Sequence, residues 1–194
     1  MSSVARILMI LAVTAIVIQQ VANAQDDNKY GSTRASKRLM KELQRFYESD
    51  SFKNGVFSVE LVDDNIYEME VKVLIIDADS PLYIGLQKLK EHGGKDHLKL
   101  RVSYKDDYPI SPPSVRVVYP IFQTPPVSPT GFICMELLSP QGWSSAYTLE
   151  PLLIQIAATL SQVRVDPSAD IEQYSPSEED KLNYTKFLER HPGW

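Results

Sequence analysis

The order of local patterns along the chain predicts an α+β fold with a four-stranded antiparallel sheet. A pattern of helical spacing comes first, and four segments with strand patterns follow it. A long stretch without a clear period then precedes two more helical patterns, and no segment is repeated. A length of 194 residues accommodates one compact domain with short appendages.

The first predicted helix starts near residue 33, where Ser32 or Thr33 provides the N-cap. Its apolar residues recur at helical spacing and form one stripe: Leu39, Met40, Leu43, Phe46 and Tyr47. Four basic residues are expected largely on the other faces: Arg34, Lys37, Arg38 and Lys41. The domain therefore opens with an amphipathic helix that has a basic side.

The sheet is predicted to be a meander. Four segments have strand patterns: 56–62, 66–76, 98–104 and 114–119. The first two are expected to pair as a hairpin, because Asp63-Asp64-Asn65 between them is a turn sequence. A short helix is predicted between the second and third strands, from Ser80-Pro81 to Gly93-Gly94.

After the sheet, residues 120–145 contain several Pro and Gly and show no clear period. Long irregular segments inside compact domains usually have a function. Thr148 is expected to cap the next helix, with Pro151 in its first turn. The buried stripe of that helix is Leu152, Leu153, Ile156 and Leu160. A capping box at residues 175–178 predicts a last helix that ends near Arg190.

The composition excludes several kinds of protein. The 20 Lys and Arg against 25 Asp and Glu give a net charge of -5, so nucleic acid is not an expected partner. Cys134 is the only cysteine, which excludes an intramolecular disulfide framework and a multi-cysteine metal site. His92, His97 and His191 lack the spacing of metal ligands. We therefore expect neither a metal nor a cofactor.

The first 24 residues have the layout of a signal peptide. Arg6 precedes an apolar run at 7–18 that is short for a membrane span, and Ala22-Asn23-Ala24 fits the small-x-small cleavage rule. We expect a signal peptide at 1–24, or an uncleaved signal anchor that would hold the chain at a membrane. A linker at 25–32 and one domain at 33–194 follow. On the secretory route, the sequon at Asn183 would be a glycosylation site.

Cys134 is the candidate nucleophile, because the chain has no paired-carboxylate signature, serine elbow or phosphate-binding glycine loop. A lone cysteine is more often a small core residue. Cys134, however, follows Gly131-Phe132-Ile133 in the irregular segment, where a thiol can be presented at the mouth of a groove.

Three separated segments carry a resemblance to a known family: YPISPP at 108–113, GFICMELL at 131–138 and QGWSSAY at 141–147. In this order they resemble the ubiquitin-conjugating domain, specifically its divergent Q class. The first helix at 38–43 and the final Gly193-Trp194 share the resemblance, which covers roughly residues 33–194. It implies the same α+β fold, with an N-terminal helix, a four-stranded meander, a long active-site segment and two C-terminal helices.

The resemblance implies that Cys134 accepts ubiquitin as a thioester from an activating enzyme and passes it to a substrate. A thiolate suits this step because it attacks a thioester readily and also leaves readily. The resemblance also implies a RING-type ligase as a partner. Arg34, Lys37 and Lys41 would dock the activating enzyme, or would only form a solvated face. The ligase-facing residues would be Ile110, Ser144, Ser145 and Ala146.

The sequence departs from the family upstream of the cysteine. Ordinary members carry His-Pro-Asn ending eight residues before it, whereas this chain has Thr124-Pro125-Pro126. Pro126 has no donor, so the oxyanion would depend on backbone amides near Cys134 or on the side chains of Gln123 or Gln141. The Q class as a group lacks the Asn. Asp166 and Asp170 fall near the family's acidic residue for the incoming amine, or are turn formers.

Two other functions remain open from the sequence. The fold could serve as a catalytically inactive ubiquitin-binding module, although inactive relatives typically lose the cysteine. The leader favours a secreted effector with a reassigned surface. The leader also conflicts with the family's substrates, because ubiquitin and its activating enzyme are cytosolic. The sequence thus predicts the secretory route by its leader and the cytoplasm or nucleus by its family.

Overall fold

The computed structural model describes residues 32–122, 124–128 and 130–165. These residues form an α+β domain whose four-stranded antiparallel sheet has the order β1-β2-β3-β4. The predicted leader, the last predicted helix and the sequon at Asn183 lie outside the described residues. No helix in the described part of the chain is long and apolar enough to cross a bilayer.

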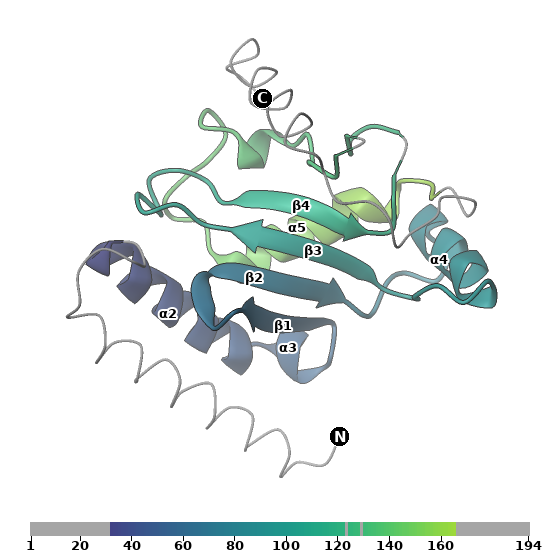
Figure 1. Cartoon of the computed structure of the whole chain (residues 1–194), viewed down its shortest axis with the longest axis horizontal. Helices are drawn as coiled ribbons and strands as arrows, with labels where there is room; N and C mark the ends of the chain where they lie inside the picture. The colour runs from purple at the N-terminus through teal and green to yellow at the C-terminus, as the bar shows by residue number, and fades with distance from the viewer. Residues whose placement is uncertain (1–31, 123, 129, 166–194) are drawn as a thin grey trace.

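The helices lie around one face and one end of the sheet, with α5 behind the strands and α4 beside their end (Figure 1). In chain order the elements are α2 (Thr33–Glu48), α3 (Asp50–Lys53), β1 (Phe57–Val62), β2 (Asn65–Val73), α4 (Pro81–Glu91), β3 (Leu98–Ser103), β4 (Ser114–Tyr119), the 3-10 helix η1 (Glu136–Leu138) and α5 (Leu149–Ser161). This order confirms the predicted fold class.

The predicted boundaries are correct where they depend on local chemistry. Ser32 caps α2, because its hydroxyl accepts from the Ala35 amide. Asp63 and Asp64 both have positive φ, which is the conformation that a two-residue hairpin turn requires. The second strand, predicted to run to residue 76, ends at Val73, which is the partner of the first residues of both neighbouring strands, Phe57 of β1 and Leu98 of β3.

The alternation of the strands separates an apolar face from a charged one. The inward side chains pack with α2, α4 and α5 into one core, in which Leu39, Val71, Leu100 and Ile156 are fully buried. The polar residues of the strands form cross-strand ion pairs: Glu60 with Lys72 (3.1 Å), Glu70 with Lys99 (2.6 Å) and Glu68 with Arg101 (2.8 Å). The sheet therefore covers the core with one face only.

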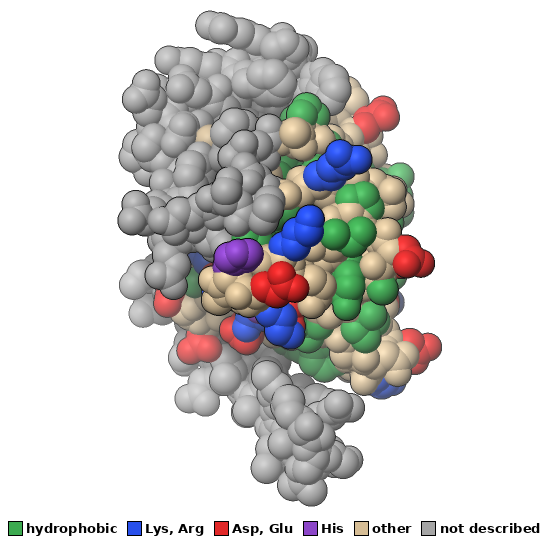
Figure 2. Space-filling view, turned by 90° about the vertical axis from the view of Figure 1, so that its right-hand side faces the viewer, with side chains coloured by type: hydrophobic (Ala, Val, Ile, Leu, Met, Phe, Trp, Pro, Cys, Tyr) green, Lys and Arg blue, Asp and Glu red, His purple; other side chains and the backbone are tan. Residues whose placement is uncertain are grey.

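Helix α4 lies between β2 and β3 in sequence and packs on the C-terminal end of α5. Its Gly85 is so close to Val165 that a Cβ there would lie 2.7 Å from the Val165 Cβ. The side of the molecule that carries α4 shows apolar side chains next to charged ones of both signs (Figure 2). Among the charged residues of this region, Lys90 pairs with Asp96 at 2.7 Å.

Candidate active site around Cys134

The segment that carries Cys134 is irregular in sequence but ordered by short backbone contacts. The Cys134 amide donates to the Pro126 carbonyl at 2.7 Å, and an isolated bridge pairs Val127 with Ile133. The Ser128 amide donates to the Phe132 carbonyl at 2.8 Å. These contacts form a narrow two-stranded loop with the cysteine at its end. The segment thus has no helical or strand period, as predicted. Its fixed conformation comes from backbone pairing that is too short to produce a pattern in the sequence.

Gly131 fixes this loop to the sheet. Its φ is +83°, and its carbonyl accepts from the Val117 amide of β4 at 2.7 Å. A Cβ at this position would lie 2.2 Å from the Val117 carbonyl oxygen, which is far inside van der Waals contact. Only glycine therefore allows the loop to approach β4 this closely, and the approach sets the height of Cys134 above the sheet.

The Cys134 side chain is partly buried and forms no disulfide. Burial raises the pKa of its thiol, because the environment disfavours the thiolate. The structure thus presents a thiol that is reachable from solvent but is largely protonated at neutral pH. Within the described residues, no group of three or more His, Cys, Asp or Glu side chains is arranged to hold a metal ion.

The two backbone amides nearest to the thiol, which were expected to support the oxyanion, both have carbonyl acceptors within the loop. The Cys134 amide already donates to Pro126, and the Met135 amide donates to the Ile133 carbonyl at 3.1 Å. Gln141 lies exposed in the turn after η1. Gln123, Asp166 and Asp170 lie outside the described residues, so their expected roles stay predictions.

A tight turn follows the cysteine and was missed by the sequence analysis. Ser139 is fully buried, and its hydroxyl donates to the Glu136 carbonyl at 2.7 Å while accepting from the Gly142 amide at 3.2 Å. The Trp143 amide then donates to the Ser139 carbonyl at 3.0 Å. The turn leads the chain from η1 back toward the loop between β3 and β4.

An open groove of about 450 Å³ lies beside the cysteine segment. Its lining residues are Met135, Glu136, Leu137, Tyr147, Pro151, Leu152 and Gln155. One wall is therefore formed by the three residues that directly follow Cys134, and the other by Tyr147 and the first turns of α5. Its lining offers both apolar and polar contacts.

The structure brings the predicted ligase-facing residues together. Ile110 is 68% exposed at the end of the β3–β4 loop, and Ser144, Ser145 and Ala146 are all exposed. The indole N–H of Trp143 donates to the Pro109 carbonyl at 2.9 Å and thereby joins the two segments.

The predicted basic face of α2 is only partly correct. Arg34, Lys37 and Lys41 are exposed as expected. Arg38, which was placed with them, instead turns toward the protein and forms an ion pair with Glu42 one turn later. The reason is that Glu42 occupies a position of the buried stripe, three residues after Leu39, and needs a cation there.

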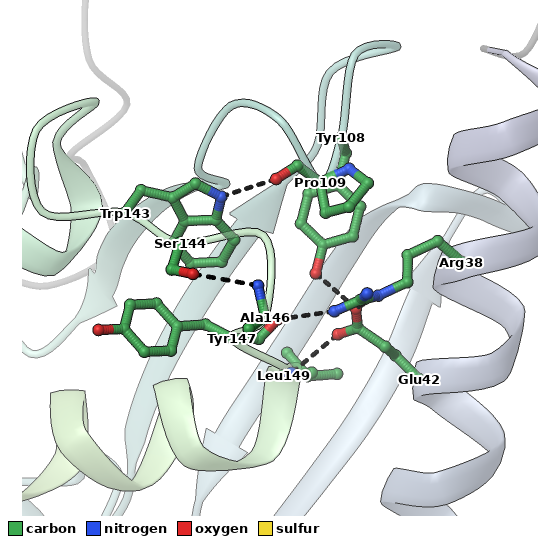
Figure 3. A network of polar contacts seen from close by, with 9 residues as sticks. All are labelled: Arg38, Glu42, Tyr108, Pro109, Trp143, Ser144, Ala146, Tyr147 and Leu149. Atoms are coloured by element: carbon green, nitrogen blue, oxygen red, sulfur yellow. Dashed lines mark hydrogen bonds and ion pairs between the residues drawn. The ribbon is translucent and has the colours of Figure 1, made fainter.

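Glu42 is the centre of a buried network that joins three parts of the fold (Figure 3). One carboxylate oxygen accepts from Arg38 and from the Tyr108 hydroxyl at 2.7 Å, and the other accepts from the Leu149 amide at 2.8 Å. Burial, followed by this contact with Glu42, raises the pKa of Tyr108. Thr148 stands at the N-cap of α5 as predicted but makes no side-chain capping bond, and Glu42 supplies a negative charge at this end of the helix, where it accepts from the first amide.

The sequence of the chain is similar to that of known proteins. A sequence model described as ubiquitin-conjugating enzyme matches residues 38–191. The chain is 46% identical over 168 residues to human ubiquitin-conjugating enzyme E2 Q1, covering 84% of this chain and 40% of that protein. It is 38% identical over 161 residues to human ubiquitin-conjugating enzyme E2 Q-like protein 1, covering 80% of this chain and 95% of that protein.

The match to E2 Q1 concerns only part of that protein, since the chain spans about two fifths of its length. Among solved structures, a ubiquitin-conjugating enzyme E2 from Plasmodium falciparum superimposes with a TM-score of 0.54 at 20% identity, covering 71% of this chain and 92% of that one. This likeness shows the fold. The family match over residues 38–191 shows more: the chain belongs to the ubiquitin-conjugating enzyme family.

Proposed function

We propose that this chain is an active ubiquitin-conjugating enzyme in which Cys134 carries ubiquitin as a thioester. The observation that supports this most directly is the placing of the only cysteine of the chain. It lies at the end of a loop that Gly131 fixes to the sheet, next to an open groove. A cysteine kept only for packing would not require such a loop.

The proposed chemistry is two successive acyl transfers. The Cys134 thiolate attacks the thioester between ubiquitin and the activating enzyme, and the thiolate of that enzyme leaves. An acceptor nucleophile on the substrate then attacks the new thioester, loses its proton, and releases the Cys134 thiolate. Met135, Glu136 and Leu137 on one side and Tyr147 on the other would hold the C-terminal residues of ubiquitin in the groove.

The partners follow from the family and from the exposed surfaces. The activating enzyme would dock on Arg34, Lys37 and Lys41, and a RING-type ligase on the surface formed by Ile110 and the turn at 144–146. At the position of the family's Asn, Pro126 contributes its carbonyl to the Cys134 amide. The oxyanion would then depend on Gln123 or Gln141, and the incoming amine on Asp166 or Asp170.

The test is a charging reaction with the full chain, activating enzyme, ATP and ubiquitin, run beside Cys134→Ser. The wild type should form an adduct that a reductant removes, and the Ser variant should form none or an ester that the reductant leaves intact. If the wild type forms no adduct under any condition, the enzymatic proposal is wrong and the inactive ubiquitin-binding module takes its place.

The cellular route of the chain is a separate proposal. We propose that residues 1–24 act as a leader, because their layout matches a signal peptide. Expression in animal cells would give a mature N-terminus near Gln25 and, on the secretory route, a glycan at Asn183 removable by a glycosidase. An intact N-terminus on a cytosolic, unglycosylated product would contradict it.

A further inference from the structure

The segment from Trp143 to Leu149 connects the two surfaces that the proposed reaction uses. Its exposed residues Ser144 to Ala146 belong to the predicted ligase-facing surface. Tyr147, directly after it, lines the groove beside the cysteine. The position of this one segment therefore affects both the docking of a ligase and the width of the groove.

Two of the contacts that hold the segment in place come from residues of α2, at the segment's C-terminal end. The guanidinium of Arg38 donates from Nη2 to the Tyr147 carbonyl at 2.9 Å and from Nε to the Glu42 carboxylate. The same carboxylate accepts from the Leu149 amide at 2.8 Å. Arg38 and Glu42 thus fix the chain on both sides of Thr148, and Figure 3 shows both contacts within one cluster.

The turn itself adds only local contacts. The Tyr147 amide donates to the Ser144 carbonyl at 3.0 Å, and the Trp143 ring lies edge-on to the Tyr147 ring with centroids 5.6 Å apart. The Trp143 indole is held by the Pro109 carbonyl. These contacts shape the turn, but Arg38 is what attaches its C-terminal end to α2.

We infer that Arg38 is a positioning residue for ubiquitin transfer, which sets the groove wall at Tyr147 opposite the segment that follows Cys134. This inference rests on the proposed function. Arg38 has no described contact with Cys134 and acts through Tyr147 and Glu42. It differs in this from Arg34, Lys37 and Lys41, which lie on the exposed side of the same helix.

Arginine is required because one rigid group must reach two acceptors. The planar guanidinium places Nε and Nη2 at fixed positions, one toward the carboxylate and one toward the carbonyl. A lysine ammonium keeps the charge that Glu42 needs but offers a single nitrogen. Arg38→Lys therefore separates the geometric role from the charge.

The test compares Arg38→Lys with Arg45→Lys, a control at an exposed position of the same helix. Both are made in full-length chain carrying Trp194→Phe, so that Trp143 is the only indole. Each protein is first charged with ubiquitin, and the activating enzyme is then stopped with EDTA. Hydroxylamine is added as the acceptor nucleophile, and the loss of the thioester is followed in a single turnover. Acrylamide quenching of Trp143 reports the position of the segment without reference to activity.

We expect Arg38→Lys to charge to the same extent, to discharge roughly tenfold more slowly, and to show stronger quenching of Trp143. Arg45→Lys should match the parent in the extent of charging, in the rate of discharge and in the quenching of Trp143. Unchanged discharge and quenching in Arg38→Lys, or equal losses in both variants, would overturn the inference. If Arg38→Lys does not fold, the double variant Arg38→Gln/Glu42→Gln, which leaves no buried charge, replaces it with the same expectation.

The quenching measurement distinguishes failure of this inference from failure of the proposed function. A parent protein that forms no thioester contradicts the proposed function. Stronger quenching in Arg38→Lys would still show that Arg38 sets the segment, and unchanged quenching would overturn that claim as well.

Discussion

Replacing Gly131 with alanine tests whether the close approach of the cysteine loop to β4 is real. The new Cβ would lie 2.2 Å from the Val117 carbonyl oxygen, so loop and strand must separate by about 1 Å to reach van der Waals contact. Overpacking of this kind costs roughly 1–3 kcal/mol, and a positive φ costs alanine about 1–2 kcal/mol more. The expected loss of unfolding free energy is therefore about 2–5 kcal/mol.

Gly55→Ala is the matched control, because Gly55 has a φ of +74° but no atom within 4 Å of the position of its Cβ. It should lose only about 1–2 kcal/mol, so the difference between the variants isolates the steric contact. Urea unfolding of both variants measures this, and charging of Cys134 should fall only in Gly131→Ala. Equal stability losses in the two variants would show that the loop does not touch β4 as described.

Four further predictions concern single side chains. Tyr104→Phe should raise the unfolding free energy by roughly 1 kcal/mol, because its buried hydroxyl has no partner among the described residues. Tyr108→Phe should lower the free energy of unfolding by about 1.5–3 kcal/mol, because Glu42 loses a donor. If urea unfolding showed Tyr108→Phe to be more stable than Tyr104→Phe, the network would be contradicted. The rate of charging should rise from pH 7 to pH 9, because burial raises the pKa of Cys134 and more thiolate forms as pH increases; a flat profile would refute this. Ile110→Ala should change urea stability by less than about 0.5 kcal/mol, since the side chain is 68% exposed, and a larger loss would mean that Ile110 is packed.

The sequence predicted the elements whose rules are local. The hairpin turn at Asp63-Asp64 and the cap at Ser32 depend on residues within three positions of each other, and both are found in the structure. The end of β2 at Val73 could not be predicted, because it depends on where its partner strand begins. Local chemistry decides how an element starts, whereas pairing decides how far it runs.

Part of the candidate site depends on contacts between distant residues. Glu42 lies 66 positions from Tyr108 and 107 from Leu149, so no spacing in the sequence connects them. One signal was nevertheless available. Glu42 follows Leu39 by three positions and precedes Phe46 by four, which puts a charged residue on the buried stripe of α2. A carboxylate at such a position requires a partner, and Arg38 lies four residues earlier, on the same face of the helix, where the structure pairs the two.

The burial of Cys134 affects both steps of the proposed reaction. A higher thiol pKa lowers the thiolate fraction at neutral pH, and the stronger nucleophilicity of each remaining thiolate offsets this loss only in part. In the second step the same thiolate is the leaving group, and a higher pKa makes it leave more slowly. Burial thus favours a thioester that persists until a nucleophile is held in place beside it. Rate would then be controlled by the position of the groove walls, which is the property that Arg38 is proposed to set.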